Sequence, residues 1–175
     1  MRLLSLALLA APLLVAPLAA AQVPLPEAGG AASDAIHLLE FTSGGGTVSL
    51  DVDAASAGNE PTDAVDATTE LHWVNGLGQT AKLTVSTVCP GQRFGLSVEA
   101  VVTSWGSGTV ATVAPPVTLT DGMAEVDLLR DIPTGDPDRE GTASLSYRAS
   151  ATVADGTSAD HGDDIHTVTY TFLAQ

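Results

Sequence analysis

The chain of 175 residues has a single cysteine, few aromatic residues and few basic ones. One cysteine, Cys89, excludes a disulfide within the chain, so the folded state must be stabilised by burial. Six Lys and Arg residues stand against 21 Asp and Glu residues, a formal net charge of −15. Nucleic acids and anionic membranes attract basic surfaces and are therefore disfavoured as partners. The acidic excess indicates solubility in concentrated salt, with specific cation binding as the alternative.

Familiar catalytic motifs are also missing from the sequence. It contains no Gly-x-Ser-x-Gly elbow, no His-Glu-x-x-His, no phosphate-binding glycine loop and no paired-cysteine zinc motif. Cys89 could form a nucleophilic pair with one of the four histidines, but the sequence selects none of them. We therefore expect a protein that is not an enzyme, and a secreted hydrolase is the least favoured alternative.

Long hydrophobic runs are absent except in residues 1–21. Arg2 is followed there by an apolar run with two prolines that ends in Ala19-Ala20-Ala21, small residues suited to signal peptidase. We predict a secretory signal peptide that is cleaved before Gln22, with export to the periplasm, the cell surface or the medium. The mature chain would hold five basic and 21 acidic residues, a formal charge of −16, and would not insert into a membrane.

Alternation of apolar and polar residues dominates the remaining chain. In residues 142–153, every second residue from Ala143 to Val153 is apolar, the pattern of a half-buried antiparallel strand. Other segments with strand character are 36–41, 47–52, 71–75, 81–86, 94–103, 109–114, 117–120, 123–129 and 166–174. No segment combines a helical period with capping residues.

Eight to ten short strands predict an all-β fold in one domain, residues 36–175. We expect an antiparallel two-sheet β-sandwich, Ig-like or pilin-like, with a β-barrel as the alternative. Asp121-Gly122 predicts a hairpin between residues 117–120 and 123–129. Residues 51–70 are interpreted as a long solvated connection, and the Pro- and Gly-containing residues 22–35 as a flexible N-terminal stretch.

The loop 154–164 is the first candidate site because it concentrates carboxylates and a histidine. We interpret it as a solvated hairpin loop of an acidic protein, and the alternatives are calcium binding through its oxygens and zinc binding through His161 and His166. His166 also shares parity with the apolar residues of the last strand and is predicted to begin its core-facing row. The cofactor prediction is none, with calcium as the alternative at Asp155, Asp160, His161, Asp163 and Asp164.

Three further features are candidates for function. The segment from Asp136 to Gly141 resembles the opening of a calcium loop, but its twelfth position is Tyr147 where a bidentate Glu is needed. Trp105 stands in a turn-like sequence and could stack on a sugar or a partner protein, or else cap the core. Cys89 precedes Pro90-Gly91 and is predicted to be a buried residue at a strand end, with an intermolecular disulfide as the alternative.

The alanine-tailed signal peptide, the flexible N-terminal stretch, the Thr-rich β domain and Tyr170 near the chain end together resemble exported bacterial pilin-type and spore-coat-U-type subunits. The resemblance implies a structural or adhesive component of the cell surface that assembles by strand donation, with further copies or other surface proteins as partners. Such subunits usually carry a disulfide, and residues 22–35 lack the alternating apolar residues of a donor strand. A calcium- or carbohydrate-binding module is the alternative function.

Overall fold

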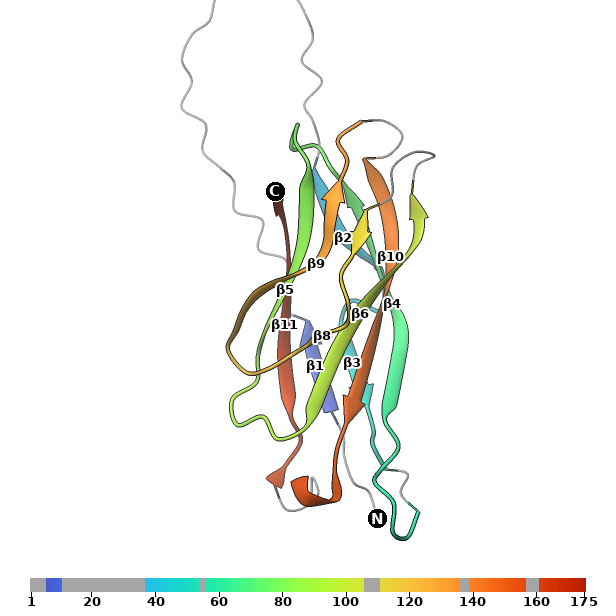
Figure 1. Ribbon diagram of the computed structural model, residues 1–175, viewed down its shortest axis with the longest axis vertical. Helices are drawn as coiled ribbons and strands as arrows, with labels where there is room; N and C mark the ends of the chain where they lie inside the picture. The colour runs from blue at the N-terminus through green and yellow to red at the C-terminus, as the bar shows by residue number, and fades with distance from the viewer. Residues whose placement is uncertain (1–5, 11–36, 54–55, 106–110, 136–138, 157–160) are drawn as a thin grey trace, which may run out of the picture.

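The computed structural model describes residues 6–10, 37–53, 56–105, 111–135, 139–156 and 161–175. Within these ranges the chain forms eleven β-strands and one turn of 3-10 helix, η1 (Val153–Asp155). The strands make two sheets that face each other along the long axis of the molecule (Figure 1). The predicted all-β sandwich is therefore confirmed, and among the described strands no hydrogen-bonded pair closes the two sheets into a barrel.

Sheet A contains the C-terminal strand and runs in the order β3-β1-β11-β5-β9-β7. Its strands pair antiparallel, except that β1 runs parallel to β11. Four of them, from β11 to β7, form a purely antiparallel sheet, and β1 and β3 extend it beyond β11. The bounds are β1 Leu6–Ala10, β3 Thr47–Leu50, β5 Ala81–Val88, β7 Thr112–Val113, β9 Met123–Ile132 and β11 Ile165–Ala174.

Sheet B is antiparallel throughout and runs in the order β2-β4-β10-β6-β8. Its central strand β10 pairs along most of its length with β4 on one side and with β6 on the other, so β10 forms backbone hydrogen bonds with both neighbours. The bounds are β2 Leu38–Ser43, β4 Ala64–Val74, β6 Gly95–Trp105, β8 Val117–Thr118 and β10 Glu140–Ser150.

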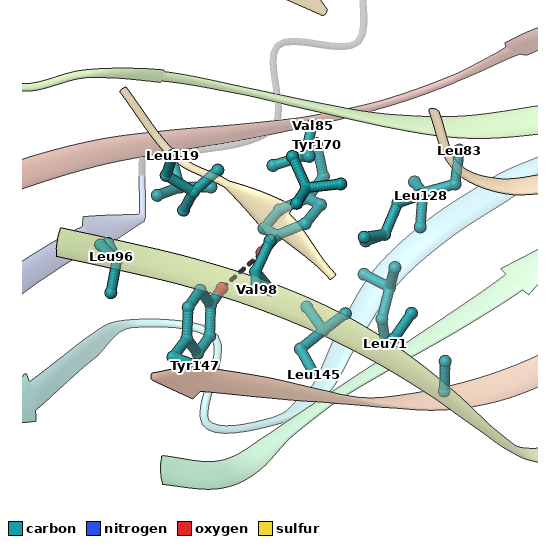
Figure 2. Close-up of a cluster of buried hydrophobic side chains, with 14 of the residues drawn as sticks. Leu71, Leu83, Val85, Leu96, Val98, Leu119, Leu128, Leu145, Tyr147 and Tyr170 are labelled. Atoms are coloured by element: carbon teal, nitrogen blue, oxygen red, sulfur yellow. Dashed lines mark hydrogen bonds between the residues drawn. The ribbon is translucent and has the colours of Figure 1, made fainter. Parts of the chain in front are cut away.

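The core lies between the sheets and is built from the alternating residues that the sequence pattern predicts. On β10 the buried row is Gly141, Ala143, Leu145, Tyr147 and Ala149, and on β6 it is Leu96, Val98 and Ala100. Sheet A contributes Leu83 and Val85 from β5 and Val168 and Tyr170 from β11. The middle of the sandwich is filled by side chains from these rows, among them Leu83, Val85, Leu96, Val98, Leu145, Tyr147 and Tyr170 (Figure 2).

One hydrogen bond crosses this core from sheet to sheet. The Tyr147 hydroxyl, from β10, lies 2.6 Å from the Tyr170 hydroxyl, from β11, and both residues are buried (Figure 2). Burial raises the pKa of Tyr147 to about 12, against a weaker opposing effect of the Tyr170 hydroxyl. Both phenols therefore stay protonated at neutral pH, and each polar group satisfies the other.

Three local predictions are corrected by the structure. Residues 51–70 are not one solvated connection, because β4 begins at Ala64 and pairs with β10. The turn at Asp121-Gly122 forms, with Met123 donating to the Thr120 carbonyl, but β8 and β9 enter different sheets, so it is not a hairpin. The strand predicted to reach Val153 ends at Ser150, and Val153 is 67 % exposed in η1.

Residues 6–10, which belong to the predicted signal peptide, form β1 in sheet A. The predicted flexible stretch 22–35 lies outside the described residues. Within the described part of the chain, no helix has the length and hydropathy needed to cross a bilayer.

Candidate functional site

A tight turn after β5 positions the only cysteine of the chain. Pro90 and Gly91 occupy its two central positions, Gly91 has φ 79°, and the Gln92 N–H donates to the Cys89 carbonyl at 3.0 Å. Proline followed by a residue with positive φ is the signature of a type II turn, which glycine accommodates without strain. Cys89 continues the inward row of β5 and is only 1 % exposed, so the prediction of a buried thiol is confirmed.

The beginning of β11 brings Asp164 and His166 to the same end of the sandwich. Asp164 is buried, and its Oδ2 accepts hydrogen bonds from the backbone N–H groups of Arg93 (2.9 Å) and Phe94 (2.8 Å). These bonds tie the start of β11 to the connection between β5 and β6. His166 is 0 % exposed, which confirms that it begins the core-facing row of the last strand.

Cys89, Asp164 and His166 form a buried cluster. One potential ligand atom from each, the Cys89 Sγ, a carboxylate oxygen and a ring nitrogen, lies within 4.8 Å of the other two. Among the described residues this is the one group of three or more such side chains that could hold a metal ion. The cluster joins a residue that follows β5 to two residues 75 and 77 positions later in the chain.

Burial controls the protonation of the cluster. Burial, with smaller contributions from the nearby Asp164 and Asp121 carboxylates, raises the pKa of the Cys89 thiol to about 11, and a hydrogen bond from the Ile165 backbone opposes this rise. Burial lowers the pKa of His166, against smaller opposing effects of the same two carboxylates. At neutral pH the thiol and the imidazole are therefore both uncharged. A protonated, inaccessible thiol is a poor nucleophile, so this arrangement does not favour Cys–His catalysis.

His166 has one engaged and one unengaged ring nitrogen. Its Nδ1 lies 3.2 Å from the Thr87 Oγ1, on the neighbouring strand β5. Its Nε2 is buried and has no hydrogen-bond partner among the described residues. Buried polar atoms in folded proteins are paired in the great majority of cases, so an unpartnered imidazole nitrogen calls for an explanation.

A second feature of this end of the molecule is the place of β1 in sheet A, which we call the strand slot. β1 lies between β3 and β11, in antiparallel register from Leu6 opposite Leu50 and in parallel register from Ala7 beside Ile165. In the described sheet, β1 is the strand to which β3 is hydrogen-bonded. Removing β1 would therefore leave the strands on both sides of the slot with unpaired backbone groups.

The residues of the predicted calcium loop are found in different environments. Asp155 caps η1, its Oδ2 accepting from the Thr152 N–H (2.6 Å) and hydroxyl (2.8 Å). His161 and Asp163 are exposed, Asp164 is buried in the cluster, and Asp160 lies outside the described residues. Calcium binding at this loop stays a prediction.

The other predicted sites also differ from the cluster. Trp105 is the last residue of β6, not part of a turn, and it is 44 % exposed, so it does not cap the core. Its role in ligand binding stays a prediction. In the second acidic segment, Asp136 and Asp138 lie outside the described residues, and Tyr147 at the twelfth position is a core residue.

No motif in the sequence connects Cys89 with Asp164 and His166. The signal that could have done so is parity, because Cys89 ends the inward row of one strand and His166 begins the inward row of another. That signal is useful only with the pairing register, which places Thr167 opposite Val88 and so brings the two row ends together.

Comparison with known proteins finds no family model, no curated protein and no solved structure that matches this chain.

Proposed function

We propose that the protein is an exported, non-enzymatic β-sandwich that acts as a structural component of the cell surface and associates by strand insertion. The observation that carries the proposal is the strand slot. Its occupant, β1 (Leu6–Ala10), belongs to the segment that the sequence predicts to be removed as a signal peptide.

Cleavage before Gln22 would open the slot. β3 and β11 would then expose backbone N–H and C=O groups on facing edges, separated by the width of one strand. Unpaired strand edges are templates for another chain, and a strand that enters here gains hydrogen bonds on both sides. Val48 and Leu50 of β3 are core residues, so an empty slot would also expose apolar surface.

The chemistry of β1 indicates what the slot accepts. Its sequence, Leu-Ala-Leu-Leu-Ala, is uncharged and aliphatic. We propose that another copy of this chain supplies a strand of this kind after export. If a different surface protein supplies the strand instead, the pure protein will bind a matching peptide but will not associate with itself.

The test uses protein purified after export, examined by size-exclusion chromatography with light scattering and by electron microscopy. We expect oligomers, and we expect a synthetic peptide of residues 4–11, flanked by lysines for solubility, to bind and to dissociate them. Ser49→Pro removes a backbone N–H donor from β3, the strand that pairs with β1 in the described sheet. This change should weaken both oligomer formation and peptide binding, whereas Ser49→Ala should weaken neither. A protein that is monomeric at high concentration and does not bind the peptide would refute the proposal.

A further inference from the structure

We propose that Cys89, Asp164 and His166 bind one Zn²⁺ ion through the Sγ atom, a carboxylate oxygen and a ring nitrogen, with a fourth position open to water. This inference goes beyond the proposed surface role, and none of the three ligands comes from β1, the strand in the slot. The three ligand atoms lie within 4.8 Å of one another. Zinc bonds of 2.0–2.3 Å place the ligand atoms of a tetrahedral site roughly 3.3–3.7 Å apart, so small side-chain rotations are enough to close the site.

The charges of the cluster match a divalent cation. A thiolate and a carboxylate together carry −2, and with a neutral imidazole and Zn²⁺ the buried site has no net charge. A neutral site avoids the large penalty of burying an isolated ion. The Asp164 Oδ2 is held by two backbone N–H groups, and none of the hydrogen bonds described above uses Oδ1. Zinc binding would displace the proton of the Cys89 thiol, because the thiolate is the form that binds metal.

The hydrogen bonds around His166 fit a metal ligand. The Thr87 hydroxyl donates to the Thr167 carbonyl at 3.3 Å, so Oγ1 is left to accept the hydrogen bond from the Nδ1–H of His166. The imidazole is then neutral, and the lone pair is on Nε2, the nitrogen without a partner among the described residues. Metal-binding histidines usually donate their other ring N–H to a neighbouring group, which fixes the tautomer in this way.

The donor set discriminates between metals. Calcium and magnesium take oxygen ligands, whereas sulfur and imidazole nitrogen favour zinc and similar transition metals. The cluster is thus a different site from the predicted calcium loop, although both include Asp164. Its geometry indicates a stabilising role, because the ion would join the end of β5 to the beginning of β11.

Cobalt substitution tests the proposal directly. Co²⁺ bound to a thiolate gives an intense charge-transfer absorption, and Cys89 is the only cysteine in the chain, so this band can come from no other residue. Protein treated with a chelator should develop the band, saturate at one equivalent of Co²⁺, and lose the band when Zn²⁺ is added. Millimolar Ca²⁺ should not displace the cobalt.

Variants locate the site. Cys89→Ser should abolish the band, while Asp164→Asn and His166→Gln should weaken cobalt binding more than about 100-fold, since even outer-shell partners of metal ligands cost 10- to 100-fold. Asp163→Asn is the matched control, because this exposed carboxylate is adjacent in sequence and should not change the affinity. The wild-type spectrum decides the outcome even if a variant fails to fold. No band, saturation at half an equivalent, or equal weakening by Asp163→Asn would overturn the proposal.

Discussion

The hydroxyl pair between the two sheets offers a stringent test of the packing. Tyr147 on β10 and Tyr170 on β11 are buried and donate and accept a single hydrogen bond of 2.6 Å. Tyr170→Phe keeps the ring but leaves the Tyr147 hydroxyl buried without its partner, which should cost about 1–3 kcal/mol. Tyr147→Phe should cost a similar amount. The double variant removes both hydroxyls, so it should cost clearly less than the sum of the two single changes.

Urea unfolding of the four proteins, with linear extrapolation of the free energy of unfolding, measures this coupling. We expect a coupling energy of about 0.5–1.5 kcal/mol or more, the net contribution of one hydrogen bond. If the two single effects sum to the effect of the double variant within about 0.5 kcal/mol, the two hydroxyls are not bonded to each other, and the reasoning is refuted.

The same pair predicts a loss of stability in alkali. Burial raises the pKa of Tyr147 to about 12 and raises the pKa of Tyr170 well above its ordinary value. Because the folded state holds these protons more tightly than the unfolded state, the stabilisation is complete below about pH 10 and is lost as the pH rises through 12. The chain has two tyrosines, so tyrosinate absorbance reports on this pair alone. The variant with both tyrosines changed to Phe should lack the loss of stability that comes from their ionisation.

Three further predictions concern single sites. Trp73→Ala should cost about 3–5 kcal/mol, because Trp73 is 2 % exposed, whereas Trp105→Ala should cost less than about 1 kcal/mol; urea unfolding compares the two. Asn75→Ala should cost about 2 kcal/mol or more in the same assay, because the Asn75 side chain donates to the Ile132 and Pro133 carbonyls and accepts from the Leu77 N–H. Zn²⁺ at 100 times its dissociation constant should add about 2.7 kcal/mol to the stability, seen as a higher melting temperature that Cys89→Ser lacks.

The strand pattern was predictable where packing follows a local rule. Successive side chains of a strand point to opposite faces, so the apolar rows of β6, β10 and β11 are visible in the sequence and are the rows that the structure buries. In the first half of β4 the buried row is interrupted, because the pairing with β10 shifts at a bulge, and Val65 and Ala67 are exposed although they share the parity of the buried Leu71. This half is a strand because β10 is long enough to pair with it, and backbone hydrogen bonds do not require apolar side chains.

The turn at Asp121-Gly122 shows a related limit. Its residues determine that the chain reverses, and the structure has the reversal, but they do not determine which sheet each flanking strand joins. Trp105 was misplaced for a similar reason. The small residues after it suggest a turn, while pairing of β6 with β10 extends the strand to Trp105 itself, opposite Gly141.

By itself the sequence determined the all-β class, the inward rows of the main strands, the burial of Cys89 and the core-facing parity of His166, because each depends on neighbours within a few residues. Tertiary structure alone decided that Cys89 meets Asp164 and His166, that Tyr147 bonds to Tyr170, and that one strand position lies between β3 and β11. Those contacts depend on strand order and register, which arise from pairing between segments that are distant in the chain. A local pattern can give the face on which a residue lies, but not the residue that it meets there.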